Sequence, residues 1–480
     1  MIRSAAHGQF GGSSSGGEIY STLEVKPSAY STLEVRGDNY RGHASDVLNQ
    51  GYKALPGLPI VAEHDGLHVV GQQQSPSPSP EPGVTVTGGR IICGLRARTF
   101  WIVFAVVVVV VAGAVAGGTA AALVSRDNPK AVMAGTRLSS TYFDDGSGND
   151  NYLLLYQLNN KAIYMSAFNS STGAWVVSPV VDGTTEAGGG LEDVVKGTAL
   201  SISRYGRTNS GDIHVYWQST TGTVRSLVYS NLSTTEPAAP DGWTESQKRA
   251  DFKTAGPGAS IVSYGSTCYD CAPDIYYFCQ LPTGRITGAW SSPKYRASDG
   301  DPEWNTVDFL NNVALPAMQT SMAVVSTPSL DFTGELSLFA QSEAGLLTHI
   351  AFDGESDYRE YPLETNFSSV AAIAAVSHGF IDGDGDLALG IRVLTVEPSA
   401  PVYLTYFRDG AWDPAREVSE MSDCSSRASI ATNDGFRVYC VVDGSRGGVE
   451  IAEWRGQSDP KGNASDFTNY ERVGTVITSV

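Results

Sequence analysis

The sequence is poor in positive charge. Its 480 residues include 32 Lys and Arg against 51 Asp and Glu, which gives a formal net charge of −19 at pH 7. A protein that binds nucleic acid needs a basic surface to neutralise phosphates. Nucleic acid is therefore excluded as a partner.

Motifs for catalysis are also scarce. Beyond residue 125 the only histidines are His214, His349 and His378, which lie far apart, and no His-Glu-x-x-His motif is present. The one Gly-x-Ser-x-Gly match, at 12–16, lacks the strand and helix patterns that a nucleophile turn requires. We predict that the chain is not an enzyme. A glycoside hydrolase stays open as an alternative, because carboxylates are abundant and such enzymes need only a facing pair.

One long hydrophobic run stands out. Residues 100–124 contain no charged side chain. As a helix they would extend roughly 37 Å, which exceeds the ~30 Å core of a bilayer. Three arginines closely precede the run and two basic residues follow it. We predict one transmembrane helix at 100–124, with the N-terminus cytoplasmic and the rest extracellular or lumenal.

Sequons and cysteines agree with this orientation. All four Asn-x-Ser sequons follow the run, and we predict N-glycosylation at Asn169, Asn231, Asn366 and Asn463. Five of the six cysteines also follow it, as expected on an oxidising side of a membrane. We expect a disulfide between Cys424 and Cys440. Cys268 and Cys271 are better explained by disulfides than by a metal site, because no second ligand pair has matching spacing.

The N-terminal tail, 1–99, is rich in Gly, Ser and Pro and has no hydrophobic periodicity. We predict that it is disordered. Within it the hexapeptide Tyr-Ser-Thr-Leu-Glu-Val occurs twice, beginning at Tyr20 and Tyr30. An exposed Tyr with Leu three residues later can dock as an extended peptide, which suggests a trafficking adaptor as a partner. A duplicated low-complexity stretch is the alternative.

The region after the hydrophobic run contains a repeat. Aromatic-rich apolar runs end at Gln157, Gln218, Gln280 and Gln341, with spacings of 61, 62 and 61 residues. In the last three units a Gly follows four residues later, and another apolar run follows the Gly. This pattern predicts strand, turn and strand, with the Gly in the turn of a β-hairpin.

The repeat predicts the fold class. Short apolar runs begin near residues 137, 198, 259, 322, 370 and 428, which gives six units without helical periodicity. We predict an all-β fold, a six-bladed β-propeller over 136–480, with a short stalk at 125–135 before it. A pair of β-sandwiches is the alternative, although it would not require equal spacing.

At these residues the chain resembles the fungal fucose-specific lectin family. That family repeats an Arg-Val-Tyr-x-Gln strand, a short Gly turn, an Ile-Arg-Glu strand and a Gly-x-Trp turn. The resemblance covers nearly all of 136–480. It implies a six-bladed propeller whose sugar sites lie between blades, where an Arg and a Glu bind ring hydroxyls and an aromatic ring packs on the apolar sugar face.

The family's site residues map onto this sequence one by one. The strand Arg matches Arg392 and Arg437 only. The turn Trp matches Trp175, Trp243 and Trp412. The Glu position falls on Ser226, Gly288 and His349, and near Leu404 and Ile451. We therefore expect no unit to keep the complete set, and the best pair to be Arg392 with Trp412, which share a unit.

The resemblance implies a membrane-anchored lectin-like protein that binds glycans or cell-wall polysaccharide without a cofactor. The alternative is a protein-interaction or adhesion propeller that has lost its sugar sites. A weaker prediction concerns calcium. Asp382, Asp384 and Asp386 alternate with other residues in a Gly-containing loop, and hard cations prefer such oxygen ligands.

Overall fold

The computed structural model describes residues 128–206, 211–246, 252–256, 258–265, 275–291, 304–307, 313, 316–327, 336–352, 358–378, 390–408, 411–445, 447–456 and 469–479. The predicted tail at 1–99 and the predicted span at 100–124 lie outside these residues. Within the described ranges, no helix is both long and apolar enough to cross a bilayer.

The described strands form six four-stranded antiparallel sheets. Blades 1 and 2 comprise β1 (Ser139–Asp144), β2 (Asp150–Gln157), β3 (Ile163–Asn169), β4 (Ala174–Val181), β5 (Leu200–Tyr205), β6 (Asp212–Gln218), β7 (Val224–Ser230) and β8 (Trp243–Glu245). Blades 3 and 4 comprise β9 (Ile261–Gly265), β10 (Ile275–Gln280), β11 (Ile286–Ser291), β12 (Asn305–Val307), β13 (Met322–Ser326), β14 (Leu336–Gln341), β15 (Leu346–Phe352) and β16 (Tyr358–Asn366). Blades 5 and 6 comprise β17 (Ala372–His378), β18 (Gly390–Val396), β19 (Val402–Arg408), β20 (Ala411–Glu417), β21 (Ile430–Thr432), β22 (Arg437–Asp443), β23 (Val449–Gly456) and β24 (Tyr470–Thr475). The described residues also form the short 3-10 helices η1 (Ala187–Gly189), η2 (Leu191–Asp193), η3 (Pro240–Gly242) and η5 (Ser419–Ser426).

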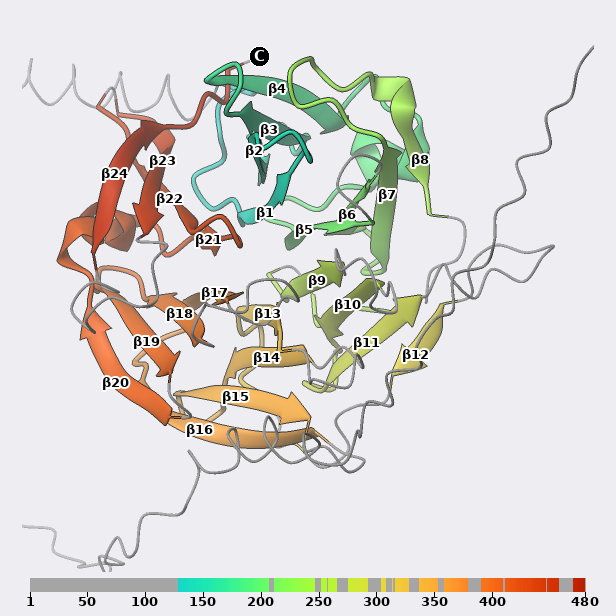
Figure 1. Cartoon of the computed structure of the whole chain (residues 1–480). Coiled ribbons are helices and arrows are strands. Elements are labelled where there is room, and N and C mark those ends of the chain that lie inside the picture. The colour runs from blue at the N-terminus through green and yellow to red at the C-terminus, as the bar shows by residue number, and fades with distance from the viewer. Residues whose placement is uncertain are drawn as a thin grey trace, which may run out of the picture. The chain divides into compact units, whose positions relative to one another are not determined.

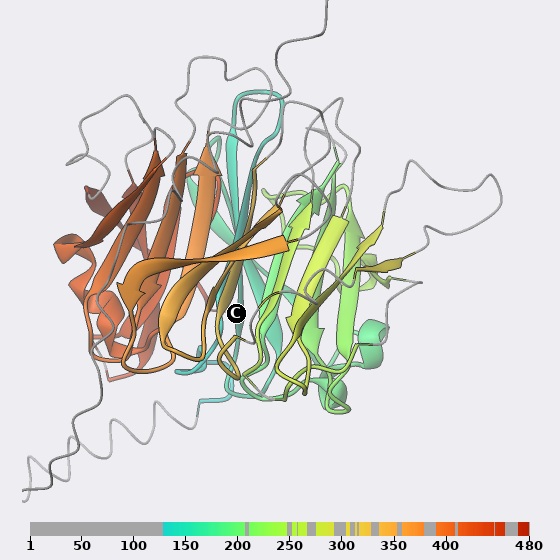
Figure 2. The same cartoon turned by 90° about the horizontal axis from the view of Figure 1, so that it is seen from below.

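The sheets are arranged as blades around a common axis, with β1, β5, β9, β13, β17 and β21 innermost (Figure 1). Each innermost strand contacts the innermost strands of both neighbouring blades, and β21 contacts β1 to close the ring. Figure 2 shows the blades edge-on, standing side by side. The predicted all-β, six-bladed propeller is confirmed.

Burial explains the sequence pattern of the strands. A second strand such as β2 is packed between two neighbouring blades, and seven of its eight residues are buried. It is therefore almost continuously apolar, as strands covered on both faces are. In the outer strand β16 only Tyr358, Leu363 and Thr365 are buried, and the other residues are exposed or partly exposed, because this strand lies at the outer edge of its sheet. The repeated turn glycines, such as Gly222 at φ 81°, have the left-handed backbone that the hairpin requires.

The repeated glutamine links each of the first four blades to the next one through hydrogen bonds, an arrangement that we call the interblade fastening. The Gln157 side-chain nitrogen donates to the Lys161 carbonyl in its own hairpin (2.8 Å) and to the Val195 carbonyl at the start of blade 2 (2.9 Å). Its side-chain oxygen accepts from the Gly197 nitrogen at 2.7 Å. Gln280 makes the same three kinds of bond between blades 3 and 4. The 61-residue spacing therefore reflects an interblade fastening.

The two ends of the described chain complete the ring without exchanging a strand. The Ser429 hydroxyl of blade 6 donates to the Thr136 carbonyl at 2.7 Å. The Ser166 hydroxyl of blade 1 donates to the Ile477 carbonyl at 2.7 Å. Val132 pairs with Leu158, so the propeller begins before residue 136. Residues 128–135, which we expected to form a stalk, pack on blade 1 because Val132 and Met133 are apolar and buried.

Candidate functional site

An ion pair lies in the interface between blade 6 and blade 1. Arg437 begins β22, and the register places Tyr439 of β22 opposite Glu453 of β23. The Arg437 Nη1 lies 3.4 Å from the Glu453 Oε1, and the Tyr439 hydroxyl donates to that same oxygen at 3.4 Å. Both charged side chains are largely buried, with exposed fractions of 13% and 7%. Alternate residues of a strand share a face, so this group points together toward blade 1.

Blade 1 meets this ion pair with a row of four aromatic rings, one from each strand. The register aligns Tyr142, Tyr152, Phe168 and Trp175 across β1 to β4. Successive ring centroids are 5.3, 6.1 and 5.4 Å apart. The Arg437 guanidinium carbon lies 4.9 Å from the centre of the Tyr152 ring, a cation–π distance. Trp175 packs edge-on against Tyr439 at 6.3 Å.

A tight turn at 433–436 positions Arg437. The Asn433 side-chain oxygen accepts from the backbone nitrogens of Gly435 (3.1 Å) and Arg437 (3.4 Å). Its side-chain nitrogen donates to the Ser140 hydroxyl of blade 1 at 2.6 Å. A Cβ on Gly435 would lie 2.5 Å from a Tyr152 ring carbon. Glycine therefore allows the turn to lie directly against the aromatic row.

Burial and charge act in opposite directions on the ion pair. Burial raises the pKa of Glu453, and the Arg437 charge only partly offsets this effect. For Arg437, burial is the largest single effect and lowers the pKa, but attraction to Glu453 together with the interactions with Tyr152 and Tyr439 outweighs it, so the net shift is upward. The guanidinium therefore stays charged. The Arg437 guanidinium offers planar hydrogen-bond donors, the Glu453 carboxylate offers an acceptor, and the aromatic row offers an apolar surface. Together they suit a ligand that has hydroxyl groups around its edge and one apolar face.

Glu453 was missed in the sequence, where the acidic position of this unit was assigned near Ile451. In blade 2, His214 and Ser226 occupy the Arg and Glu positions, 12 residues apart (214 to 226). In blade 6, 16 residues separate Arg437 from Glu453 (437 to 453). The hairpin between β22 and β23 is four residues longer, so a fixed spacing gives the wrong residue. The turn itself has five residues in both blades, 219–223 and 444–448, so the four extra residues lie in the paired strands, two in each.

Arg392 and Trp412, which we expected to act together, lie in different interfaces. The Arg392 guanidinium carbon is 4.7 Å from the Phe436 ring centre of blade 6. Trp412 instead packs edge-on against Phe339 (5.7 Å) and His349 (5.5 Å) of blade 4. A tryptophan of one blade therefore faces the preceding blade, whereas the arginine of a second strand faces the following one. The structure brings Arg437 together with Trp175 and separates Arg392 from Trp412.

Trp243 has a packing role. It is 2% exposed, and its indole nitrogen donates to the Pro179 carbonyl of blade 1 at 3.1 Å. Leu153 and Met165, at the Arg and Glu positions of blade 1, lie in the same apolar cluster. This interface has no polar group in place of the ion pair among those described side chains. It is a hydrophobic contact between blades 1 and 2.

The remaining predicted sites have different outcomes. A disulfide joins Cys424 of η5 to Cys440 of β22. Cys279 is a buried free thiol whose pKa burial raises to about 12. Three sets of predicted residues lie outside the described ranges, namely Cys268 with Cys271, the loop residues Asp382, Asp384 and Asp386, and the sequon Asn463.

Asn169 is a poor acceptor for a glycan. It is 5% exposed, and its side-chain nitrogen donates to Asn151 (2.7 Å) and Thr234 (3.0 Å). Glycosylation there would break both bonds and displace the packing around them. Asn231 and Asn366, in contrast, are exposed.

Comparison with known proteins gives the fold. No protein-family model matches the chain, and no curated protein matches it. Among solved structures, the chain is similar to the Aleuria aurantia lectin in complex with alpha-methyl-L-fucoside, with 14% identity and a TM-score of 0.53 over 73% of this chain and 98% of that one. A mutant of AofleA from Arthrobotrys oligospora gives 13% identity and a TM-score of 0.52 over 72% and 88%. A further structure of the Aleuria lectin describes a six-bladed β-propeller with a fucose recognition mode, and it aligns with a TM-score of 0.52.

Proposed function

We propose that this chain is a lectin with one working glycan site, between blades 6 and 1. The observation that supports it is the buried Arg437–Glu453 ion pair facing the aromatic row that ends at Trp175. Arg437 would donate to sugar hydroxyls, Glu453 would accept from them, and Trp175 would pack on the apolar face of the sugar. Tyr152 and Tyr439 would hold the two charged groups in position.

The proposed ligand is a glycan with a fucose-type residue. Support comes from the shared fold with lectins, one of which was solved with alpha-methyl-L-fucoside. The proposed site also has the Arg, Glu and Trp that the resemblance implies, now drawn from two blades. Cell-wall polysaccharide is an equally suitable polymer if it exposes such a residue.

We place this lectin on a membrane through the span at 100–124, with the propeller extracellular or lumenal. The support is the uncharged run and the distribution of sequons. A trafficking adaptor that binds at Tyr20 or Tyr30 would fit a cytoplasmic tail. These parts of the proposal rest on the sequence alone.

Glycan binding by the full chain, solubilised in detergent, tests the site. Arg437→Ala and Glu453→Gln each remove one charged hydrogen-bonding group, so glycan affinity should fall at least about tenfold. Arg427→Ala is the matched control, because Arg427 is bonded to the exposed Asp443 and lies away from the aromatic row. Unchanged affinity in both site variants, at unchanged thermal stability, would remove the site from consideration.

A protein-interaction propeller is the second candidate. The observation in its favour is that no other described blade keeps both the Arg and the Glu: blade 5 keeps only Arg392, and the other pairs are residues such as Leu153 with Met165 and Ser337 with His349. His349 is hydrogen-bonded to Ser337 at 2.8 Å and packs against Trp412. The polar side chains at these two positions therefore already have partners within the protein. Absence of binding across a broad glycan panel would favour this candidate.

A further inference from the structure

All four lysines that the structure describes lie at one end of the propeller, the end where the second strand of each blade finishes. Lys161 is in the β2–β3 turn of blade 1, and Lys196 is in the segment that leads into β5. The Gln157 side-chain nitrogen donates to the carbonyls of Lys161 (2.8 Å) and Val195 (2.9 Å). The backbones that carry these two lysines therefore meet at a single amide group.

Lys130 and Lys253 extend this pair. The Asn160 backbone nitrogen donates to the Pro129 carbonyl at 3.1 Å, which places Lys130 beside the blade 1 turn. Lys253 forms an isolated bridge with Thr223 at the end of the blade 2 turn. The residues Lys130, Lys161, Lys196 and Lys253, which we call the lysine arc, therefore follow consecutive turns and connecting segments of blades 1 and 2.

Lys161 has a backbone conformation that disfavours its residue type. Its φ is 76°, in the left-handed region. It occupies the position of Gly222, Gly284 and Gly345 in the turns of blades 2 to 4, where φ is 81°, 84° and 82°. Glycine adopts this conformation without steric cost, whereas a side chain strains it. Strained residues gather at functional sites, so this lysine indicates a use for its charge.

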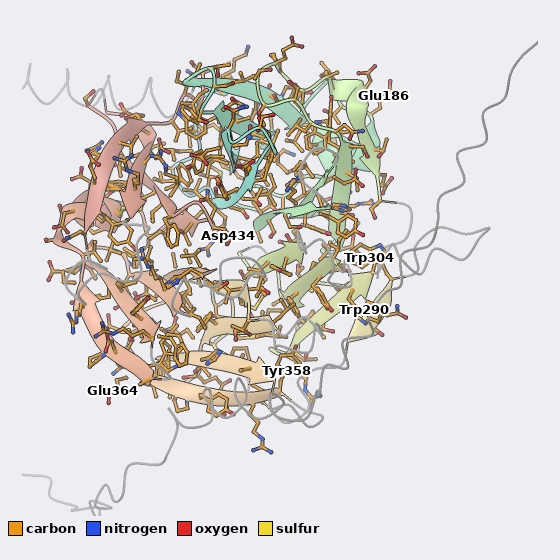
Figure 3. All side chains as sticks on the ribbon, in the orientation of Figure 1. Glu186, Trp290, Trp304, Tyr358, Glu364 and Asp434 are labelled. Carbon is orange, nitrogen blue, oxygen red and sulfur yellow. A yellow bond between two sulfur atoms is a disulfide. The ribbon has the colours of Figure 1, made fainter. Side chains whose placement is uncertain are left out.

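Acidic side chains do not neutralise the lysine arc. Among the described residues no ion pair involves any of its four lysines. Asp193, close to Lys196 in sequence, is instead paired with Arg225 at 2.7 Å. Glu186 lies at the outer rim of the ring (Figure 3). The exposed Glu192 offsets at most one of the four charges, so the surface remains positive.

Exposed neutral side chains accompany the lysines. Asn160 precedes Lys161, and Thr220 and Thr221 are in the blade 2 turn, which hydrogen-bonds to the segments before β5 and β9. Amide and hydroxyl groups form neutral hydrogen bonds with hydroxyl-bearing ligands. A surface that binds protein would instead need an apolar centre, from which lysine is usually depleted. The lysine arc therefore suits a polymer that has both anionic and hydroxyl groups.

We propose that the lysine arc binds an acidic polysaccharide, a linear sugar polymer with carboxylate, sulfate or phosphate groups. Ammonium groups on successive turns match repeated anionic groups along one chain. The overall charge of −19 opposes this association only weakly at physiological ionic strength, because exposed charges separated by more than about 8 Å are largely screened. The arc is at the opposite end of β2 from the aromatic row, so it is separate from the Arg437–Glu453 site.

Dextran sulfate is the probe for this surface, and uncharged dextran of equal length is its control. Both are labelled and titrated into the full chain in detergent, with fluorescence anisotropy as the readout. Dextran sulfate should bind saturably and more weakly as salt is added, and dextran should not bind. Polyglutamate of matched charge represents an acidic polypeptide. It should bind at least about tenfold more weakly than dextran sulfate, because its side chains lack hydroxyl groups.

Lys161→Gly introduces the residue of the other turns, so the melting temperature should not fall while one charge is lost. Combined with Lys196→Gln, it should lower the affinity for dextran sulfate at least about tenfold. Arg416→Gln with Arg455→Gln is the matched control, because it also removes two exposed positive charges, in β20 and β23. This control should bind dextran sulfate as the wild type does.

Four results would overturn the proposal. Dextran sulfate does not bind, or uncharged dextran or polyglutamate binds equally well, or the double lysine variant binds as tightly as the double arginine control, or Arg437→Ala abolishes dextran sulfate binding. The last result would assign the polymer to the lectin site. Loss of binding in the lysine variant with full binding in Arg437→Ala supports the arc, whether or not the lectin site binds its own sugar.

Discussion

Two histidines lie in blade interfaces, at positions that the sequence resemblance assigns to the charged side chains of the sugar site. His214 occupies the Arg position of blade 2, and His349 occupies the Glu position of blade 4. Burial lowers the pKa of His214 to about 4 and that of His349 to about 3. Both rings therefore stay neutral in the folded chain at physiological pH.

This burial predicts acid sensitivity. In the unfolded chain each histidine takes up a proton near pH 6.5, whereas in the folded chain it resists protonation until about pH 4 or 3. The unfolded state thus binds more protons as the pH falls below 6.5, and stability declines from there toward pH 4. His214→Phe keeps the aromatic packing on Tyr216 and removes one titrating group. Its melting temperature should fall less between pH 7 and pH 5 than that of the wild type, and an equal fall in both would contradict the assignment.

The contribution of Asp434 to stability has the opposite pH dependence. Partial dehydration by the surrounding blades raises its folded-state pKa to about 6, above the ordinary value of 3.8, so the folded chain binds this proton more tightly than the unfolded chain does. Its contribution to stability is present below pH 3.8 and is lost as the pH rises through 6. Asp434→Asn should therefore raise the melting temperature at pH 7.5 and have little effect near pH 4. A variant that is equally or less stable at pH 7.5 would contradict this.

The site residues show what the sequence could predict. Arg437 and Trp175 were predicted because their residue types match the resembling motif. Their association was not, because sequence order does not reveal which neighbouring blade a strand face meets. Glu453 was missed because a longer hairpin moved it by four positions relative to Arg437.

At the scale of the element, the glutamine that ends the second strand of each of the first four blades hydrogen-bonds to the segment that leads into the next blade. In blades 5 and 6 the corresponding residues are Val396 and Val441, so this fastening is confined to the first four units. There the sequence repeat was also most regular. The strands and turns of those units were accordingly the easiest to predict, because one residue type marks the same contact each time.

Gln157→Ala tests the fastening. It would leave the Gly197 nitrogen and the Val195 and Lys161 carbonyls without this partner, and we expect the free energy of unfolding to fall by about 2 kcal/mol or more. Gln319→Ala is the control, because that side chain is exposed and only its backbone nitrogen bonds to Gln280. Chemical denaturation of both variants provides the measurement. Equal stability of the two would show that the fastening contributes little.

At the scale of the whole molecule, the lectin site and the end of the chain that leads toward the predicted span lie at opposite ends of β2. Tyr152, in the aromatic row, is near the beginning of β2, whereas Val132 pairs with Leu158 just after its end. The aromatic row and residues 128–135 therefore lie at opposite ends of blade 1. The ring itself was predictable from the six-fold repeat, but this orientation required the structure.

Glycosylation tests the proposed side of the membrane. When the full chain is expressed in a eukaryotic secretory pathway, peptide mass spectrometry should find glycans at Asn231 and Asn366, which are exposed, and none at Asn169, which is buried. Asn231→Gln should remove one glycan, and Asn169→Gln should remove none. Glycan at Asn169 would contradict the packing, and absence of all glycans would contradict a lumenal propeller.

The most direct test of the lectin assignment is calorimetric titration of alpha-methyl-L-fucoside into the full chain in detergent. The account predicts saturable binding at one site per chain, because one described interface combines the Arg437–Glu453 pair with Trp175. It also predicts that Arg437→Ala abolishes the heat of binding. Binding that persists unchanged in this variant, or no binding in the wild type to this sugar or to any member of a glycan panel, would contradict it.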